Sequence, residues 1–293
     1  MDFPVFLVQC LNALQYGLLL FLVASGLTLI FGILGVINLA HGSFYMIGAY
    51  LAYALAPSTA EHLGGGFFTA LAIGLVLSIA FGYLLEWGFV SYLYEREHLQ
   101  QVLMTYGLIL VFEELRSILV GDDVHGVAPP AWLAGTVPLG DVMTYPVYRL
   151  FMSAVCLTVA LALYAVIART RIGMAIRAGA SNREMVQSLG VDIRLLYRIV
   201  FATGVALAVL AGMIAAPVSS VYPGMGNQVL IISFVVVVIG GIGSIRGALV
   251  ASLLVGLVDT FGNVLVPQIA GILVYLLMAA ILLWRPEGLF RTG

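Results

Sequence analysis

Few side chains in this 293-residue sequence are of a type that performs covalent chemistry. Lysine is absent, so the chain has neither the phosphate-binding lysine of a Walker A loop nor the Schiff-base lysine of a pyridoxal enzyme. The four histidines lie in separate segments without metal-ligand spacing, and His, Asp and Glu form no catalytic cluster. We therefore expect no metal site, no cofactor and no enzyme activity. Any ATP-driven work needs another polypeptide.

Polar residues within strongly apolar sequence are the next candidates. Asn38, His41 and Ser43 lie close together, and they are candidate liners of a permeation path. The simpler alternative is that Asn38 and His41 cap the ends of a broken helix and stabilise its turn. Asp259, four residues before Asn263, is the most isolated carboxylate in an apolar segment. Because an ionisable group within a membrane is a functional hypothesis by default, Asp259 joins the candidate path.

Half of the chain's arginines lie in one segment, residues 169–198, with long apolar sequence on both sides. Membrane proteins keep such arginine-rich loops in the cytoplasm. Arg177, Arg183 and Arg194 of this segment are therefore expected on the cytoplasmic side. There they can make polar contacts with the surface of a partner.

The middle of the arginine-rich segment predicts a short helix. Ser181 and Glu184 have the spacing of a capping box, and Gly190 suits the left-handed position that ends a helix. A helix of two turns is not stable in isolation, because nucleation is costly and few hydrogen bonds offset it. We therefore expect this helix to dock on a soluble partner.

Composition places these elements in a membrane. The chain is 62% hydrophobic and 9% charged, with a mean hydropathy of +1.13, whereas soluble domains are roughly 25% charged. About 20 apolar residues cross a bilayer as one helix. We predict an all-α polytopic membrane protein with one domain over residues 1–293 and eight to nine spans, of which the seventh is short enough to be re-entrant. The candidate spans are residues 5–31, 37–56, 66–92, 102–120, 147–168, 196–217, 228–243, 247–266 and 270–285.

The arginines outside the central segment set the orientation. Arg96, Arg246 and Arg285 fall on the same side as residues 169–198, which predicts a cytoplasmic C-terminus and, with nine spans, an N-terminus outside. Residues 121–146 carry no arginine and form the long outer loop. This loop either contacts an extracytoplasmic partner or is a plain connector.

Two glycine-rich segments predict breaks in the helices. They share the pattern G-x-x-G-x-I, and glycine weakens a helix by roughly 1 kcal/mol relative to alanine. Transporters are often built from repeats whose glycine-interrupted segments line the substrate path, so a weak duplication is one interpretation. The predicted topology puts both breaks on one side, however, which an inverted repeat does not. The glycines are Gly32, Gly35, Gly42, Gly240, Gly241, Gly243 and Gly247.

Four parts of the sequence together resemble one known family, the permeases of branched-chain amino acid ABC importers. The first signature comprises residues 26–32 (GLTLIFG) and 37–50 (INLAHGSFYMIGAY). The second comprises residues 240–248 (GGIGSIRGA), and the tail residues 285–289 (RPEGL) are similar too. Two positions depart from the pattern, because Ser43 stands where many relatives have an acidic residue and Arg246 where proline is common.

The resemblance implies a transport subunit in a bacterial inner membrane. Its partners would be two cytoplasmic ATPase subunits that hold ATP and Mg²⁺, a second related permease and a periplasmic substrate-binding protein. Residues 184–190 (EMVQSLG) are similar to a degenerate E-A-A-x-x-x-G loop, which such permeases insert into a groove of the ATPase. Urea, short amides and other small carboxylates are alternative substrates. A transporter or channel driven alone by an ion gradient is the rival from another class, although the sequence lacks an evident row of intramembrane carboxylates.

Overall fold

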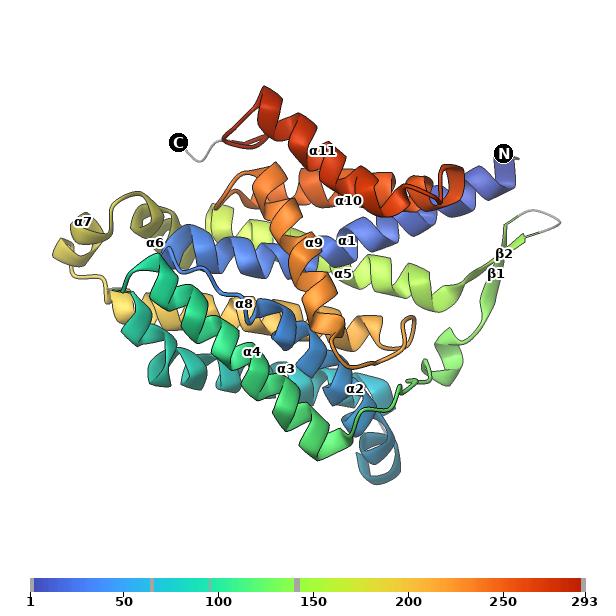
Figure 1. Cartoon of the computed structure of the whole chain (residues 1–293). Coiled ribbons are helices and arrows are strands. Elements are labelled where there is room, and N and C mark those ends of the chain that lie inside the picture. Colours follow the sequence, from blue (N-terminus) through green and yellow to red (C-terminus); the bar gives the residue numbers. More distant parts are fainter. Residues whose placement is uncertain (1–2, 64–65, 95, 140–142, 291–293) are drawn as a thin grey trace.

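The computed structural model describes residues 3–63, 66–94, 96–139 and 143–290, without the side chains of residues 61–63, Leu139, Ser181 and Arg183. Helices dominate the described chain (Figure 1). The elements before the outer loop are α1 Phe3–Leu34, α2 His41–Leu63, α3 Gly66–Gly88, the 3-10 turn η1 Val90–Leu93 and α4 His98–Val120. The loop contains η2 Ala131–Leu133, β1 Thr136–Leu139 and β2 Met143–Pro146. The later helices are α5 Val147–Arg169, α6 Arg171–Ser181, α7 Arg183–Ser188, α8 Ile193–Ala215, α9 Met225–Gly240, α10 Ile245–Leu265 and α11 Ala270–Trp284.

Five helices of the described chain, α1, α3, α5, α8 and α10, are long and apolar enough to cross a membrane. α9 and α11 are shorter apolar helices. These helices make the chain a multi-pass membrane protein, as its composition predicts. α6 and α7 lie at one end of the molecule and the β1–β2 hairpin at the other, with the C-terminus toward the first end and the N-terminus near the second (Figure 1).

Two helices form the centre of the molecule. In the most apolar stretch of α1, 83% of the residues are buried, and in that of α8, 78% are. In the corresponding stretch of α5 only 22% are buried. A helix that is apolar all round, such as α1, must be covered by other helices, while α5 leaves most of its apolar surface uncovered by the described chain. Motion of α8 relative to its neighbours therefore changes the packing of the core.

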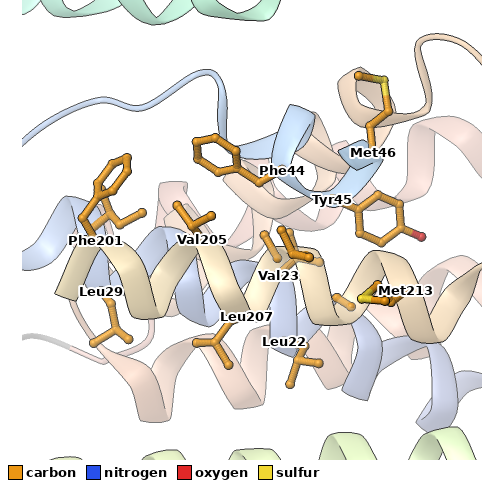
Figure 2. Packing of buried hydrophobic residues seen from close by; sticks show 14 of the residues in the cluster. Leu22, Val23, Leu29, Phe44, Tyr45, Met46, Phe201, Val205, Leu207 and Met213 are labelled. Carbon is orange, nitrogen blue, oxygen red and sulfur yellow. The ribbon is translucent and has the colours of Figure 1, made fainter. Parts of the chain in front are cut away.

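An aromatic cluster joins α2 to this centre. The ring of Phe44 on α2 lies 6.2 Å from that of Phe201 on α8, 6.2 Å from Phe81 on α3 and 6.0 Å from Phe112 on α4, measured between ring centroids. Figure 2 shows Phe44 beside Phe201 and above Val205. The buried side chain of Phe44 thus connects α2 with α3, α4 and α8.

Glycines allow α2 and α8 to approach very closely. A methyl group placed on Gly48 of α2 would lie 2.1 Å from the carbonyl oxygen of Val209 on α8. A methyl group on Gly212 of α8 would lie 2.0 Å from the carbonyl oxygen of Tyr45 on α2. Real Cβ atoms do not approach an oxygen so closely, so this backbone contact requires glycine on both helices. Small residues at helix contacts are typical of packing in membranes.

Residues 121–146 contain regular structure of their own. β1 and β2 pair antiparallel, so the described chain contains a small hairpin besides its helices. His125 exchanges two backbone hydrogen bonds with Val221, and its ring stacks on Tyr53 with 4.2 Å between ring centroids. Arg116 pairs with Asp122 at 2.9 Å, and this hydrogen bond holds the pKa of Asp122 below its usual value. The loop is therefore fastened to α2, α4 and the α8–α9 connection.

Candidate coupling surface and transport path

The arginine-rich segment forms two helices, α6 and α7, rather than the single short helix expected from the sequence. Ser181 is the last residue of α6, so its prediction as the capping residue is wrong. Asn182 is extended, with φ −149°, and its side-chain oxygen accepts a hydrogen bond from the Met185 amide at 2.9 Å. Asparagine and serine are both good caps, and a helix that already includes Ser181 leaves Asn182 as the extended residue between the two.

The end of α7 agrees with the sequence. Gly190 has φ +85°, the left-handed conformation that glycine adopts readily, so its prediction as the terminating residue is confirmed. Val186 is buried, and it anchors α7 to the rest of the molecule. Met185 is 58% exposed and Leu189 is 75% exposed, and Glu184 is exposed beside them. α7 thus turns one residue inward and presents an apolar and acidic face to the outside.

The arginines of this segment have different surroundings. The guanidinium of Arg177 donates a hydrogen bond to the carbonyl oxygen of Ile167, near the end of α5. Arg183 begins α7, and its side chain lies outside the described residues. Arg194 is exposed on the first turn of α8 and lines a cavity of about 920 Å³. Because of these contacts, α6 is fixed to α5 while Arg194 is open to a partner.

The 920 Å³ cavity contains a buried ion pair that the sequence analysis missed. Arg198 of α8 donates to Glu86 of α3, with 3.2 Å between Nε and Oε2, and the Glu86 side chain is 1% exposed. Tyr94 donates to the other oxygen of Glu86 at 2.5 Å. The signal was available, because Glu86 is an ionisable residue within a predicted span. α8, which follows α7 directly, is therefore joined to α3 beside the exposed helix.

The two glycine-rich segments meet in space. α1 ends at Leu34 and is followed by Gly35 with φ +67°, while α9 and α10 are separated by residues 241–244. A methyl group on Gly32 would lie 2.4 Å from the Cα of Gly243, so the two segments touch. Both segments therefore lie at the same end of the molecule.

The other predicted glycines also make close contacts. A methyl group on Gly42 would lie 2.2 Å from the Gly226 carbonyl oxygen, and one on Gly247 would lie 1.9 Å from the Gly240 carbonyl oxygen. Gly241 has φ +95° and packs against the carbonyl oxygen of Phe290 in the C-terminal tail. These glycines bring α2 against α9 and the start of α10 against the end of α9. Such contacts cannot be made by residues with larger side chains.

Three of the predicted path residues lie together in the core. Asn38, His41 and Ser43 are all buried. The Asn38 side-chain oxygen accepts from the Ala40 amide at 3.1 Å, and His41 Nε2 lies 3.0 Å from the Val23 carbonyl oxygen. Since a carbonyl oxygen only accepts, this His41 nitrogen carries the proton. These contacts hold the α1–α2 connection against α1, and the role of the three residues in transport stays a prediction.

Asp259 lies elsewhere, on α10. Its carboxylate accepts a hydrogen bond from the Asn263 side chain at 3.3 Å, one helical turn later. Tyr16 of α1 interacts with it electrostatically. Asp259 is partly exposed, so one side of it faces away from the described chain. The structure does not bring it together with Asn38, His41 and Ser43, and its transport role also stays a prediction.

The family model and the similar proteins agree on one family. The family model described as branched-chain amino acid transport system / permease component matches residues 9–282. The chain is 30% identical to the high-affinity branched-chain amino acid transport system permease protein BraD of Pseudomonas aeruginosa, over 97% of this chain and 95% of that protein. It is 28% identical to the corresponding permease protein LivH of Escherichia coli, over 98% of this chain and 96% of LivH. It is also 27% identical to E. coli LivM, over 90% of this chain and 66% of LivM.

No solved structure matches this chain. The family model nevertheless covers almost the whole sequence, including both glycine-rich segments and the arginine-rich segment between them. The relatives are aligned along nearly their full lengths in the case of BraD and LivH. The chain therefore belongs to the family of permease components of branched-chain amino acid transport systems.

Proposed function

We propose that this protein is a permease subunit of an ATP-binding cassette importer for branched-chain amino acids. Family membership supports the transport role, and the relatives are named as permeases of such systems. The single observation that carries the coupling role is α7, a short capped helix with exposed Met185 and Leu189 at one end of the molecule. Because the chain has no lysine for a Walker A loop, partner subunits bind ATP and Mg²⁺.

Coupling follows from the connection between α7 and the core. A partner ATPase that grips the exposed face of α7 moves Gly190 and hence the start of α8. α8 is largely buried, and the Arg198–Glu86 ion pair joins it to α3, so a displacement at α7 reaches two membrane helices. Packed interiors shift between discrete arrangements rather than deforming continuously. The partner ATPases close on binding ATP and open again after hydrolysis, and these two movements thus open and close the transport path.

We further propose that nine helices, α1 to α5 and α8 to α11, cross the inner membrane, with breaks between α1 and α2 and between α9 and α10. α6 and α7 then lie in the cytoplasm with the C-terminus, and the outer loop lies in the periplasm with the N-terminus. The arrangement in Figure 1 supports this orientation, because the two ends of the molecule carry these segments separately. The arginine-rich segment favours the cytoplasm for the α6–α7 end.

The proposed partners are a second related permease, cytoplasmic ATPase subunits and a periplasmic substrate-binding protein. E. coli has two relatives of this chain, LivH and LivM, both named as permease proteins of the high-affinity branched-chain amino acid system. This supports pairing with a second, related permease. The ordered outer loop, fastened through His125 and Arg116, offers a surface for the binding protein.

The coupling role is tested with Met185→Ser/Leu189→Ser, which removes apolar contacts from the exposed face of α7 without touching buried Val186. The matched control is Leu99→Ser, since Leu99 is 67% exposed at the start of α4. We expect the double variant to lose ATPase copurification and substrate-stimulated ATP hydrolysis at unchanged thermal stability. Leu99→Ser is expected to retain both activities.

Transport is then measured with the reconstituted importer and labelled leucine, with urea and short amides as competitors. ATP-dependent leucine uptake that the double variant lacks supports the proposal. Uptake by the purified permease alone, driven by an ion gradient without ATPases, overturns it. Preference for urea or an amide over leucine overturns the substrate assignment and leaves the coupling role intact.

A further inference from the structure

A second cavity, of about 830 Å³, lies where the two glycine-rich segments meet. Its wall combines the end of α1, the end of α5, α6 and the residues between α9 and α10. α6 thus lines the same cavity as residues of both family signatures. The lining includes Thr28, Gly32, Tyr164, Ile176, Arg177 and Arg246.

The charge of this cavity is one-sided. Arg177 and Arg246 line it, and no aspartate or glutamate is among the described residues that do so. The guanidinium of Arg246 donates to the Tyr164 hydroxyl at 3.0 Å and lies 5.4 Å from the centroid of its ring. By contrast, the 920 Å³ cavity mixes arginines with Glu86 and Asp192. The 830 Å³ cavity therefore favours a ligand that carries a carboxylate or another anionic group.

Two helix ends of opposite polarity border the cavity. α1 ends at Leu34, and the helix dipole gives this end a partial negative charge. α10 begins at Ile245, and its first amides give that end a partial positive charge. Gly32 and Ile33 of α1 and Ile245 of α10 all line the cavity. In a zwitterion bound here, the positive group is stabilised by the end of α1 and the negative group by the start of α10.

Thr28 provides an independent sign of a ligand. It is 1% exposed and lines the cavity, yet its hydroxyl has no hydrogen-bond partner among the described residues. Ser25 and Thr105, two other buried helical residues with hydroxyl groups, donate back to the preceding turn, to the Leu22 and Gln101 carbonyl oxygens. A buried hydroxyl without a partner is costly, by about 1–3 kcal/mol, so an acceptor or donor is expected to occupy the space beside it.

We propose that this cavity holds the transported amino acid on the cytoplasmic side before its release, which deepens the proposed function and rests on it. The carboxylate binds Arg246 and the start of α10, and the ammonium group lies near Thr28 and the carbonyl end of α1. The aliphatic side chain lies on the apolar wall, which includes Leu29, Ile33 and Ile176. The volume is within the range of about 300–1,000 Å³ for small-molecule sites. Since α6 is part of the wall, movement of the α6–α7 segment changes the site directly.

The test is ligand protection of a cysteine in the cavity. Ala180→Cys places a thiol on the exposed part of the lining, and Ala178→Cys places one on the same helix outside the lining. Cys10 and Cys156 are first replaced by alanine, and the variants are purified as complete importers in lipid nanodiscs. Maleimide modification is followed by mass spectrometry with and without L-leucine. Leucine is expected to slow modification several-fold at position 180 and to leave position 178 unchanged.

Analogues separate the two charges of the ligand. Isocaproate lacks the ammonium group and isoamylamine lacks the carboxylate, so neither is expected to protect position 180 at the concentration at which leucine does. Thr28→Val and Arg246→Gln, each combined with Ala180→Cys, should raise the half-protecting leucine concentration roughly tenfold, as expected for one lost hydrogen bond to a charged group. Thr203→Val is the control, because the exposed Thr203 hydroxyl bonds to Ile199.

Failure of this inference is distinguishable from failure of the proposed function. Equal modification of position 180 with and without leucine overturns the site, even when ATP-dependent uptake is intact. Equal protection by inorganic phosphate or by isocaproate overturns the zwitterion assignment, because an anion alone would then suffice. When the unmodified importer shows no ATP-dependent uptake, the proposed function fails. In that case the protection experiment still shows whether leucine binds in the cavity.

Discussion

Glu86 of α3 and Arg198 of α8 form an ion pair across 112 residues of sequence, with a carboxylate almost wholly buried and a guanidinium whose side chain is 25% exposed. Removing one member of a buried pair leaves the other charge without compensation. The pair stands beside the exposed helix α7 and joins two helices of the membrane domain. It is therefore a structural requirement of the end of the molecule that carries α7.

Glu86→Gln is expected to destabilise the protein, because the amide has one acceptor oxygen where the buried carboxylate uses two, one for Tyr94 and one for Arg198. The measurement is thermal unfolding of the purified chain in detergent. Glu113→Gln is the control, since Arg116 retains its second partner, Asp122. Replacing both members by apolar residues, Glu86→Leu with Arg198→Met, should recover most of the loss. Equal stability of Glu86→Gln and Glu113→Gln would show that the buried pair contributes nothing.

Gly48→Ala is expected to cost about 1–3 kcal/mol, because its methyl group would enter the backbone of α8 at Val209. Folded yield and thermal unfolding are the measurements. Gly107→Ala is the matched control, because nothing lies within 4 Å of a methyl group at Gly107 in α4. That variant should be as stable as the unmodified chain or slightly more so, since alanine favours a helix by roughly 1 kcal/mol. A stable Gly48→Ala would contradict the close contact.

Asn182→Ala is expected to weaken α7 by about 1 kcal/mol through loss of its capping hydrogen bond to Met185. The effect should be visible in hydrogen exchange of residues 183–190 and in lower stimulated ATP hydrolysis. Global unfolding should hardly change, because α7 is at the edge of the molecule. Ser181→Ala is the informative comparison, since Ser181 ends α6 and does not cap α7. A larger effect at Ser181 than at Asn182 would restore the capping prediction made from the sequence.

His125→Ala is expected to loosen the outer loop, since ring stacking on Tyr53 stabilises by about 0.5–1.5 kcal/mol. Hydrogen exchange of residues 122–127 should become faster while that of α8 stays unchanged. His125→Phe keeps the ring and removes Nε2, which is buried without a partner among the described residues. Exchange in that variant should be as slow as in the unmodified chain. Identical exchange in His125→Ala would show that the backbone bridge to Val221 alone holds the loop.

Much of the fold follows from local sequence. The apolar segments correspond to helices, and Gly190 ends α7 as expected, because hydrophobic length and glycine conformation are properties of neighbouring residues. The capping residue was misplaced by one position, since Ser181 and Asn182 have similar preferences. Only the extent of the preceding helix decides between them. The β1–β2 hairpin was not foreseen within a loop rich in proline.

The sites that depend on tertiary packing could not be foreseen. Glu86 and Arg198 are far apart in sequence, and no local pattern selects one partner for the other. The glycine-rich segments were recognised individually, but their contact through Gly32 and Gly243 exists only in the folded chain. The cavity that they enclose with α6 therefore had no counterpart in the sequence. Long-range contacts of this kind are fixed by helix packing rather than by periodicity.

The C-terminal tail has a practical consequence for anyone who purifies this permease. The Leu289 and Phe290 amides donate to the Ile239 and Gly240 carbonyl oxygens at 2.8 and 3.2 Å, so the tail lies against the last turn of α9. An affinity tag fused after residue 293 would follow this contact by only three positions. A bulky tag, or a pulling force on it during purification, would disturb the start of α10. A tag at the opposite terminus, beyond Phe3, avoids the problem.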